Sequence, residues 1–367
     1  TTNIWIKIQK CAIPHKNLYF LPTFVPENSS QETKKMALSE TLYGKTPEQL
    51  AAVCAELGMP RFAAKQLARW LYAKHVEDPM RMSDIAAAHR AKLAERFRPA
   101  FTPPARITES ADGTKKYLYR TQQGAWIESA YIPDGERATL CVSSQAGCRM
   151  GCRFCATGRQ GLQQSLTAAE ILNQAVSLPE RDKLTNLVFM GMGEPMGNYK
   201  SVLSAVRQIS SMPPEGFGIS ARNITVSTVG VVPGIKKLTA EGIPVRLAVS
   251  LHAPSDELRD ELVPMNKRFN TKQVLDAAHD YWLASKRRVS IEYALMRGIN
   301  DQAEHAQLLA KRLNHYGDNW AHVNPIPLNP IEGSKWTASK PEDEQRFLEI
   351  LHRAGITATL RDTRGQD

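Results

Sequence analysis

Three cysteines stand close together in the stretch Cys148-Arg149-Met150-Gly151-Cys152-Arg153-Phe154-Cys155. This stretch indicates both the group that the protein binds and the fold that surrounds it. It places three thiols close together, with no fourth cysteine or histidine nearby in the sequence. A structural zinc ion takes four protein ligands, whereas a 4Fe–4S cubane held by three cysteines keeps one iron open. The spacing therefore favours a 4Fe–4S cluster bound by Cys148, Cys152 and Cys155. The alternatives are a redox-active thiol patch and a zinc site that takes a ligand from a distant part of the chain.

The Cys-x3-Cys-x2-Cys spacing resembles the signature of the radical S-adenosylmethionine superfamily. In that superfamily the open iron chelates the amino and carboxylate groups of S-adenosylmethionine, and the reduced cluster cleaves the sulfonium. The resemblance implies a 4Fe–4S cluster and S-adenosylmethionine as cofactors. It also implies an electron donor such as flavodoxin.

The composition is that of a globular protein with one large domain and one or two small ones. The 367 residues are 42% hydrophobic and 23% charged, and no apolar run approaches the length of a membrane helix. Six cysteines, three of them clustered, are typical of a reducing cytoplasm rather than of a disulfide framework. A net charge of +10 makes nucleic acid the expected partner. We expect a cytoplasmic monomer without a membrane partner.

Residues 1–35 differ from the rest of the chain and are expected to be a disordered extension. Five lysines and no arginine argue against a mitochondrial transit peptide, and Met36 is a possible natural start. Residues 40–100 are expected to form a helical RNA-docking domain. Its first helix is opened by the capping box Thr46-Pro47-Glu48-Gln49, and two further helices are expected over 61–74 and 84–97.

From residue 115 the hydrophobic period changes from that of helices to that of strands. Alternating apolar residues around Gln122-Gln123-Gly124 predict a β-hairpin linker over 115–137. After it, strands and helices alternate, and a second capping box, Thr167-Ala168-Ala169-Glu170, opens one of the helices. This pattern predicts an α/β fold, a partial (βα)6 barrel over 138–367, because six units are too few to close an eight-stranded barrel. The expected strands are 138–144, 185–190, 222–228, 244–250, 288–295 and 320–326.

Polar residues follow these strands at their carboxyl ends, where parallel barrels place their chemistry. Gly191-Met192-Gly193-Glu194-Pro195 follows the second strand, and its glycines let the backbone approach a ligand closely. Alone, this motif could equally be a tight turn. Glu194 can accept a hydrogen bond from a methionine amino group. Ser227, Ser250, His252 and Asn329 suit ribose hydroxyls, a carboxylate and adenine, although any one alone could be a satisfied strand end.

Longer motifs resemble those of the bacterial radical S-adenosylmethionine enzymes that methylate adenine C2 in RNA. These motifs are Leu140–Cys148, Met190–Pro195, Ser250–Pro254 and Arg361–Gly365, and the likeness runs from about residue 40 to the end. Members methylate an adenosine in the peptidyl-transferase centre of 23S rRNA, and some methylate the adenosine beside the tRNA anticodon. The resemblance implies that Cys148, Cys152 and Cys155 hold the cluster. It further implies that the cofactor is contacted by Gly193, Glu194, Ser227, Ser250, Leu251, His252 and Asn329.

Cys141 and Glu128 gain roles only through this resemblance. A cysteine in a strand is most often buried packing, and a strand glutamate is usually solvated. In the family, the cysteine at the position of Cys141 resolves a covalent RNA–enzyme intermediate by forming a disulfide bond. The glutamate at the position of Glu128 removes the proton from adenine C2.

The resemblance also predicts a departure at the end of the chain. Family members first methylate a C-terminal cysteine, a few residues beyond Thr363-Arg364-Gly365, and this chain ends at Asp367 without it. We expect the sequence to be clipped, and the 367-residue form to bind cluster and cofactor but methylate no RNA.

Basic residues are expected to neutralise RNA phosphates. Arg149, Arg153 and Arg159 flank the cysteines, and Lys236–Lys237, Lys267–Arg268 and Lys286–Arg288 lie further along the chain. Each group could instead be a solvated helix face. The target base must leave its stack to reach the pocket. Three other functions remain open: an adenine C8-methylating resistance enzyme, a glycyl-radical activase and a zinc-bearing RNA-binding module.

Overall fold

The structure is a computed structural model that describes residues 5–6, 40–317, 319–329, 333–361 and 363–364. The extension expected over residues 1–35 lies outside these residues, apart from a two-residue strand. That strand, Trp5–Ile6 (β1), pairs with Thr363–Arg364 (β13). Within the described residues no helix has both the length and the apolar character needed to cross a membrane.

The centre of the fold is a nine-stranded sheet with the order β12-β11-β10-β9-β8-β5-β4-β3-β2. All six expected strands are present, and each pairs in parallel with the next, which confirms the partial barrel. Their apolar residues are buried because helices cover one face and the barrel interior the other. The strands are Arg137–Cys141 (β5), Asn186–Phe189 (β8), Ile224–Thr228 (β9), Arg246–Ser250 (β10), Val289–Leu295 (β11) and Ala321–Pro327 (β12).

The expected hairpin is formed by Lys115–Arg120 (β3) and Trp126–Asp134 (β4). It extends the barrel sheet, because β4 pairs antiparallel with β5. Arg106–Glu109 (β2) adds an edge strand that the sequence did not predict, since all four of its residues are exposed and give no alternation. The first barrel strand ends at Cys141 rather than at Ser144, because Ser144 N–H bonds to the carbonyl of Met192 instead of continuing the ladder.

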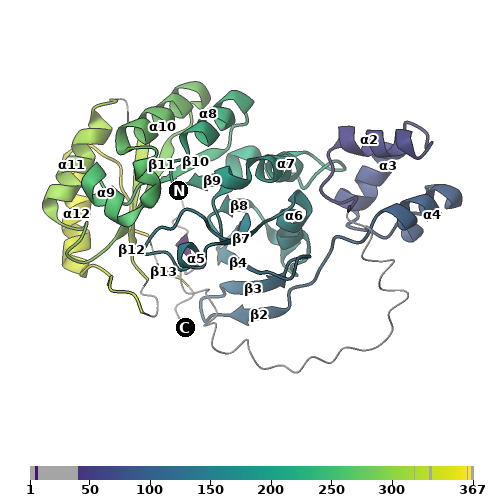
Figure 1. Cartoon of the computed structure of the whole chain (residues 1–367), viewed down its shortest axis with the longest axis horizontal. Helices are drawn as coiled ribbons and strands as arrows, with labels where there is room; N and C mark the ends of the chain where they lie inside the picture. The colour runs from purple at the N-terminus through teal and green to yellow at the C-terminus, as the bar shows by residue number, and fades with distance from the viewer. Residues whose placement is uncertain (1–4, 7–39, 318, 330–332, 362, 365–367) are drawn as a thin grey trace.

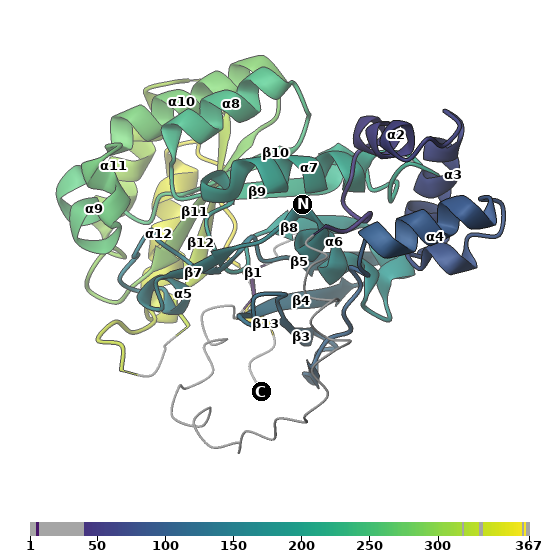
Figure 2. The same ribbon diagram turned by 45° about the vertical axis from the view of Figure 1, so that its right-hand side comes forward.

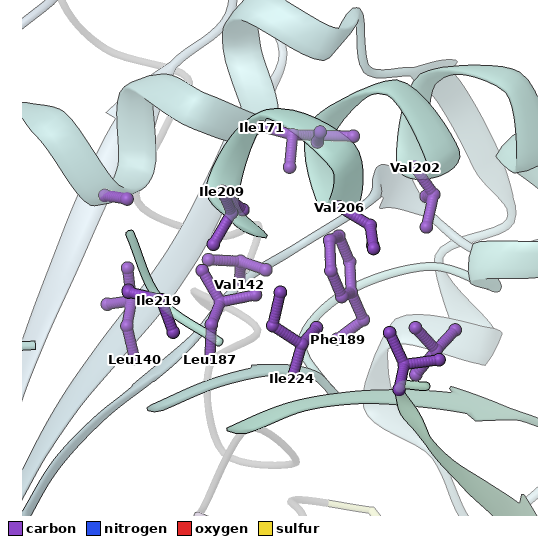
Figure 3. Packing of buried hydrophobic residues seen from close by; sticks show 14 of the residues in the cluster. Leu140, Val142, Ile171, Leu187, Phe189, Val202, Val206, Ile209, Ile219 and Ile224 are labelled. Atoms are coloured by element: carbon purple, nitrogen blue, oxygen red, sulfur yellow. The ribbon is translucent and has the colours of Figure 1, made fainter. Parts of the chain in front are cut away.

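Helices cover the outer face of the parallel strands (Figures 1 and 2). Figure 3 shows the packing at β5, β8 and β9, where Leu140, Leu187 and Ile224 point toward the helix Tyr199–Ser210 (α7), which carries Val206 and Ile209. The helices of the barrel are Ala156–Arg159 (α5), Ala168–Val176 (α6), Tyr199–Ser210 (α7), Val232–Glu241 (α8), Asp256–Leu262 (α9), Thr271–Ser285 (α10), Ala303–Asn314 (α11) and Pro341–Arg353 (α12). Short 3-10 turns are Arg181–Lys183 (η5), Pro195–Asn198 (η6), Ala221–Asn223 (η7) and Pro264–Lys267 (η8).

A group of small helices precedes the sheet and lies at one end of the molecule (Figures 1 and 2). Both halves of the Thr46 capping box are formed. The group contacts the barrel helices, since Ser204 in α7 donates to the carbonyl of Gly44 and the Thr102 N–H donates to Asn173 in α6. Its elements are Pro47–Glu56 (α2), Ala63–Ala68 (α3), the π-helical turn Arg69–Ala73 (η3), the 3-10 turn Pro79–Arg81 (η4) and Ala87–Arg96 (α4).

Candidate active site

One pocket lies at the carboxyl ends of the parallel strands and encloses about 730 Å³ not filled by protein atoms, including the solvent at its opening. The pocket brings together residues from the loop after β5 and from the ends of β8, β9 and β10. Eight of the residues expected from the sequence line it: Cys148, Cys152, Cys155, Gly193, Glu194, Ser227, Ser250 and His252.

The cysteine loop is clamped by a short antiparallel pair that the sequence did not reveal. Gln145–Gly147 (β6) pairs with Leu162–Ser165 (β7) on either side of the loop. Gly147 has φ +72°, and a Cβ there would lie 1.8 Å from the carbonyl oxygen of Gly161, so only glycine fits. The clamp fixes where the loop leaves and rejoins the barrel.

Three thiols line the pocket, together with Glu194 and His252. Three cysteines are the donor set of a 4Fe–4S cubane that keeps one iron open, whereas a structural zinc ion takes four protein ligands. Burial raises the pKa of Cys148 to about 12 and also raises that of Cys155, so the thiolates need the positive charge of a bound metal. The residues therefore fit a 4Fe–4S cluster.

The glycines of the Gly191–Gly193 turn are required by the close approach of Val142 and Gln145, and not by a ligand alone. A Cβ at Gly191 would lie 2.6 Å from the carbonyl oxygen of Val142. At Gly193, where φ is +100°, a Cβ would lie 2.5 Å from Cβ of Gln145. Gln145 accepts from the Glu194 N–H at 2.9 Å, so this close approach also positions Glu194.

Gly193→Ala is expected to lower the free energy of unfolding by about 3 kcal/mol or more, because it combines a left-handed backbone with a clash in a packed site. The matched control is Gly242→Ala, where φ is +65° but no atom lies within 4 Å of the added Cβ. That control should cost about 1 kcal/mol. Chemical denaturation of both variants measures the difference, and equal losses would contradict the steric argument.

Glu194 joins two strand ends through its buried carboxylate. One oxygen accepts from the Met196 N–H at 2.9 Å and the other from the Val229 N–H at 2.8 Å. Burial raises the pKa of Glu194 to about 6, while these hydrogen bonds limit the rise. Each carboxylate oxygen has a second lone pair, so the group can still accept from an ammonium in the pocket.

His252 is held as a neutral imidazole. Its Nδ1 accepts from the Ala294 N–H at 3.0 Å, so the ring proton is on Nε2. Burial, with Arg259 nearby, lowers the pKa of His252 to about 3. The residue has φ +61°, and its ring packs edge-on to Phe154 at 4.8 Å between centroids. This strained backbone aims the imidazole at the pocket.

Leu251 and Asn329 are not among the described residues that line the pocket. Leu251 is fully buried, and its N–H donates to the carbonyl of Glu292 at 3.0 Å. Arg259, which sequence analysis missed, orders the same region: it donates to the carbonyls of Leu251 and Val229 at 2.9 and 2.5 Å. Arg259 lies in a charge-rich helix typical of solvated surface, so only the fold reveals its burial.

Glu128 and Cys141 lie on one face of the sheet, beside the pocket. Cys141 pairs across the strands with Ala130, and Glu128 is two residues from Ala130, so both side chains point to the same side. Cys141 packs with Val188 and Met190, and Met190 also lines the pocket. Glu128 Oε2 is buried without a hydrogen-bond partner among the described residues, and burial raises the pKa of Glu128 to about 8.

Comparison with known proteins agrees with this geometry. The family model "Ribosomal RNA large subunit methyltransferase N-terminal domain" matches residues 41–98, and that of the radical SAM superfamily matches residues 142–310. A probable dual-specificity RNA methyltransferase RlmN of Bifidobacterium longum is 70% identical over 88% of this chain and 86% of its own. One from a Nocardioides species is 51% identical over 88% of this chain and 89% of its own. This chain belongs to the RlmN family of radical SAM RNA methyltransferases.

A crystal structure of a radical SAM methyltransferase from Sphaerobacter thermophilus is also similar to this chain. Its TM-score is 0.82, with 42% identity over 89% of this chain and 96% of that one.

Membership of the RlmN family confirms that the chain is an enzyme that uses a 4Fe–4S cluster and S-adenosylmethionine. One expectation drawn from the resemblance is not supported: the described residues contain no disulfide bond. Cys54, Cys141, Cys148, Cys152 and Cys155 are all free thiols. Cys141 lies in an apolar cluster with Ala130, Ile132, Val188 and Met190 and has no second cysteine within it.

The basic residues expected to bind RNA in this RlmN-family protein lie in different places. Arg149, Arg153 and Arg159 are exposed around the cysteine loop, and Lys236–Lys237 are exposed on α8. Lys286–Arg288 lie at the opposite end of the strands and line a different cleft.

Proposed function

We propose that this protein methylates C2 of an adenosine in the peptidyl-transferase centre of 23S rRNA, and C2 of the adenosine beside the anticodon of tRNA. The observation that carries the proposal is the convergence of the cysteine loop, Glu194 and His252 on one pocket, with Glu128 and Cys141 beside it. Adenine C2 is an electron-poor carbon that cannot attack a sulfonium methyl as a nucleophile. When bound, the cluster and S-adenosylmethionine supply the methyl group and the radical chemistry that this carbon requires.

The pocket residues hold S-adenosylmethionine in this proposal. Glu194 accepts a hydrogen bond from the amino group, and the Nε2–H of neutral His252 donates to an acceptor of the cofactor. The Ser227 and Ser250 hydroxyls stand 3.4 Å apart on adjacent strands and suit paired hydroxyls such as those of a ribose. Leu251 and Asn329 would contribute from the strand ends.

Glu128 and Cys141 act on the RNA base. The unpartnered Oε2 of Glu128 is a ready acceptor for the C2 proton, and its raised pKa makes it a stronger base than an exposed carboxylate. Cys141 presents a thiol on the same face of the sheet. Its sulfur would form a disulfide with the cysteine that carries the RNA, while the bond between that cysteine's sulfur and the transferred carbon breaks. The electron pair of the broken bond and a proton go to that carbon, which becomes the new methyl group. Both side chains are shielded from bulk water, which protects reactive species.

The helical domain over residues 40–100 would dock RNA, and the barrel over 138–367 would carry the chemistry. The protein would act as a monomer in the cytoplasm and receive electrons from a donor such as flavodoxin. The net charge of +10 supports an RNA partner, and the cysteine usage supports a reducing cytoplasm.

Mass spectrometry of digested 23S rRNA and tRNA, after incubation with anaerobically reconstituted enzyme, tests the proposal. We expect 2-methyladenosine at one position in each RNA. The assay is run with the 367-residue chain and with one extended by a cysteine-containing tail. A methyl group at C8, or none with the extended chain, would contradict the proposal.

A further inference from the structure

A second cleft lies at the amino ends of the parallel strands, opposite the cysteine pocket. It encloses about 1060 Å³, including the solvent at its opening, and a smaller cleft shares its residues Arg222 and Arg246. Arg246 is the first residue of β10, and Arg288 directly precedes β11. We call the combined feature the basic cleft and define it by its arginines, Arg137, Arg222, Arg246, Arg287, Arg288 and Arg361.

The positive charges of the basic cleft are only partly balanced within the protein. Glu292 lies 3.8 Å from Arg361. Within the part of the chain that the structure describes, Arg222, Arg246, Arg287 and Arg288 form no salt bridge. The backbone fixes this arrangement, because Arg287 donates to the carbonyl of Arg222 at 2.8 Å.

The positive charge of Arg246 repels three other arginines of the basic cleft, Arg137, Arg287 and Arg361. Burial, and then the nearby charge of Arg246, lowers the pKa of Arg137 and of Arg287. Burial and the charge of Arg246 also lower the pKa of Arg361, although Glu292 opposes this shift. The guanidinium groups of Arg222, Arg246, Arg287 and Arg288, which form no salt bridge among the described residues, create a site for an anion, and the planar fork of arginine favours phosphate.

The basic cleft is connected to the reacting side chains along β8. Asn186 and Val188 line the cleft, Val188 packs in the cluster that contains Cys141, and Met190 of that cluster lines the cysteine pocket. Alternate residues of a strand share a face, so this row spans about 13 Å from cleft to pocket. That is short enough for one extruded nucleotide whose backbone stays outside.

We propose that the basic cleft binds backbone phosphates of the RNA next to the target adenosine, so that the base reaches Cys141 from the amino ends of the strands. S-adenosylmethionine would occupy the pocket at the carboxyl ends, and the two substrates would meet from opposite sides. The inference rests on the proposed function, since it assumes an RNA substrate whose base is extruded. It assigns the phosphate contacts to the basic cleft rather than to Arg149, Arg153 and Arg159 at the cysteine loop.

Arg246→Gln tests the proposal without any need for turnover. The affinity of the reconstituted protein for an RNA hairpin that carries the target adenosine is measured by fluorescence anisotropy over a range of salt concentrations. We expect affinity to fall about 5- to 20-fold and the slope of log K against log salt to decrease by about 0.7 to 0.9. The affinity for a hairpin of equal length without the target adenosine should fall by a similar factor, because phosphate contacts carry no sequence information.

The matched control is Arg346→Gln, which removes one exposed charge on α12 and should leave RNA affinity within about twofold of the wild type. Protein stability separates a binding role from a structural one. Because Arg246 repels its neighbours, its removal should leave the unfolding midpoint unchanged or raise it. Inorganic phosphate should raise the midpoint of the wild type more than that of the variant.

Unchanged RNA affinity and salt slope in Arg246→Gln would overturn the proposal. If that variant unfolds more easily, Arg288→Gln, at an exposed position of the same cleft, decides by the same binding measurement. The two proposals fail separately: methylation at C8 refutes the reaction assigned above, while a weakened Arg246→Gln complex still supports the phosphate site.

Discussion

Replacing Cys152 with alanine is expected to reduce the iron and sulfide of the anaerobically reconstituted protein from about four of each per chain to near zero. The visible absorption of the cluster should disappear with them. Cys152 lines the pocket together with Cys148 and Cys155, and burial, followed by the charges of these two neighbours, raises the pKa of its thiol. Because a cubane on three cysteines has no spare protein ligand, losing one leaves two irons exposed to exchange with solvent.

Cys54→Ala is the matched control for this prediction. Cys54 is also a buried thiol, but it lies in α2 of the helical domain and packs with apolar residues. Its replacement should keep the full iron content and cost about 1 kcal/mol of stability for the small cavity. Full iron content in Cys152→Ala, or zinc without sulfide in the wild type, would contradict the cluster assignment.

The strands and their carboxyl ends could be predicted from the sequence because both leave local signals. Mostly apolar stretches such as Val289–Leu295 predict a strand, and all seven residues of this strand are buried, Ser290 and Glu292 included. Once the strands are placed in parallel, residues that follow them must meet at one edge. The sequence therefore predicts that Glu194, Ser227 and His252 lie near the cysteines, and the structure places all of them in one pocket.

The features that were missed depend on contacts between distant residues. The β6–β7 clamp has strands of three and four residues, too short to show a period. Arg259 belongs to the segment Asp256–Leu262, whose charges indicate a solvated helix, yet tertiary packing buries it completely. The basic cleft gathers arginines from five places in the chain, and no single stretch of sequence marks it.

Glu128→Gln, made in the chain extended by a cysteine-containing tail, is expected to lower the rate of adenosine methylation by about 10²- to 10⁴-fold, the usual contribution of a positioned base. The amide keeps the size of the side chain but cannot take the C2 proton. In the wild type the rate should rise with pH and level off above about 8, because burial raises the pKa of Glu128 to about 8 and only the carboxylate acts as a base. Single-turnover rates measured from pH 6 to 9 give the profile, and a variant as fast as the wild type would contradict the role.

The same substitution should stabilise the protein, which separates a base from a structural carboxylate. A folded-state pKa raised from 4.5 to about 8 means that the folded protein disfavours the charged form, so stability falls as pH rises between these values. Replacing the ionisable carboxyl by an amide should therefore add up to about 3 kcal/mol to the free energy of unfolding at pH 7. The variant should also lose this pH dependence of stability. Glu136→Gln is the control, because it makes the same chemical change at an exposed position before β5 and should alter neither rate nor stability. If denaturation at pH 7 showed Glu128→Gln to be less stable than the wild type, the carboxylate would be holding the sheet together, and its assignment as the base would lose its physical ground.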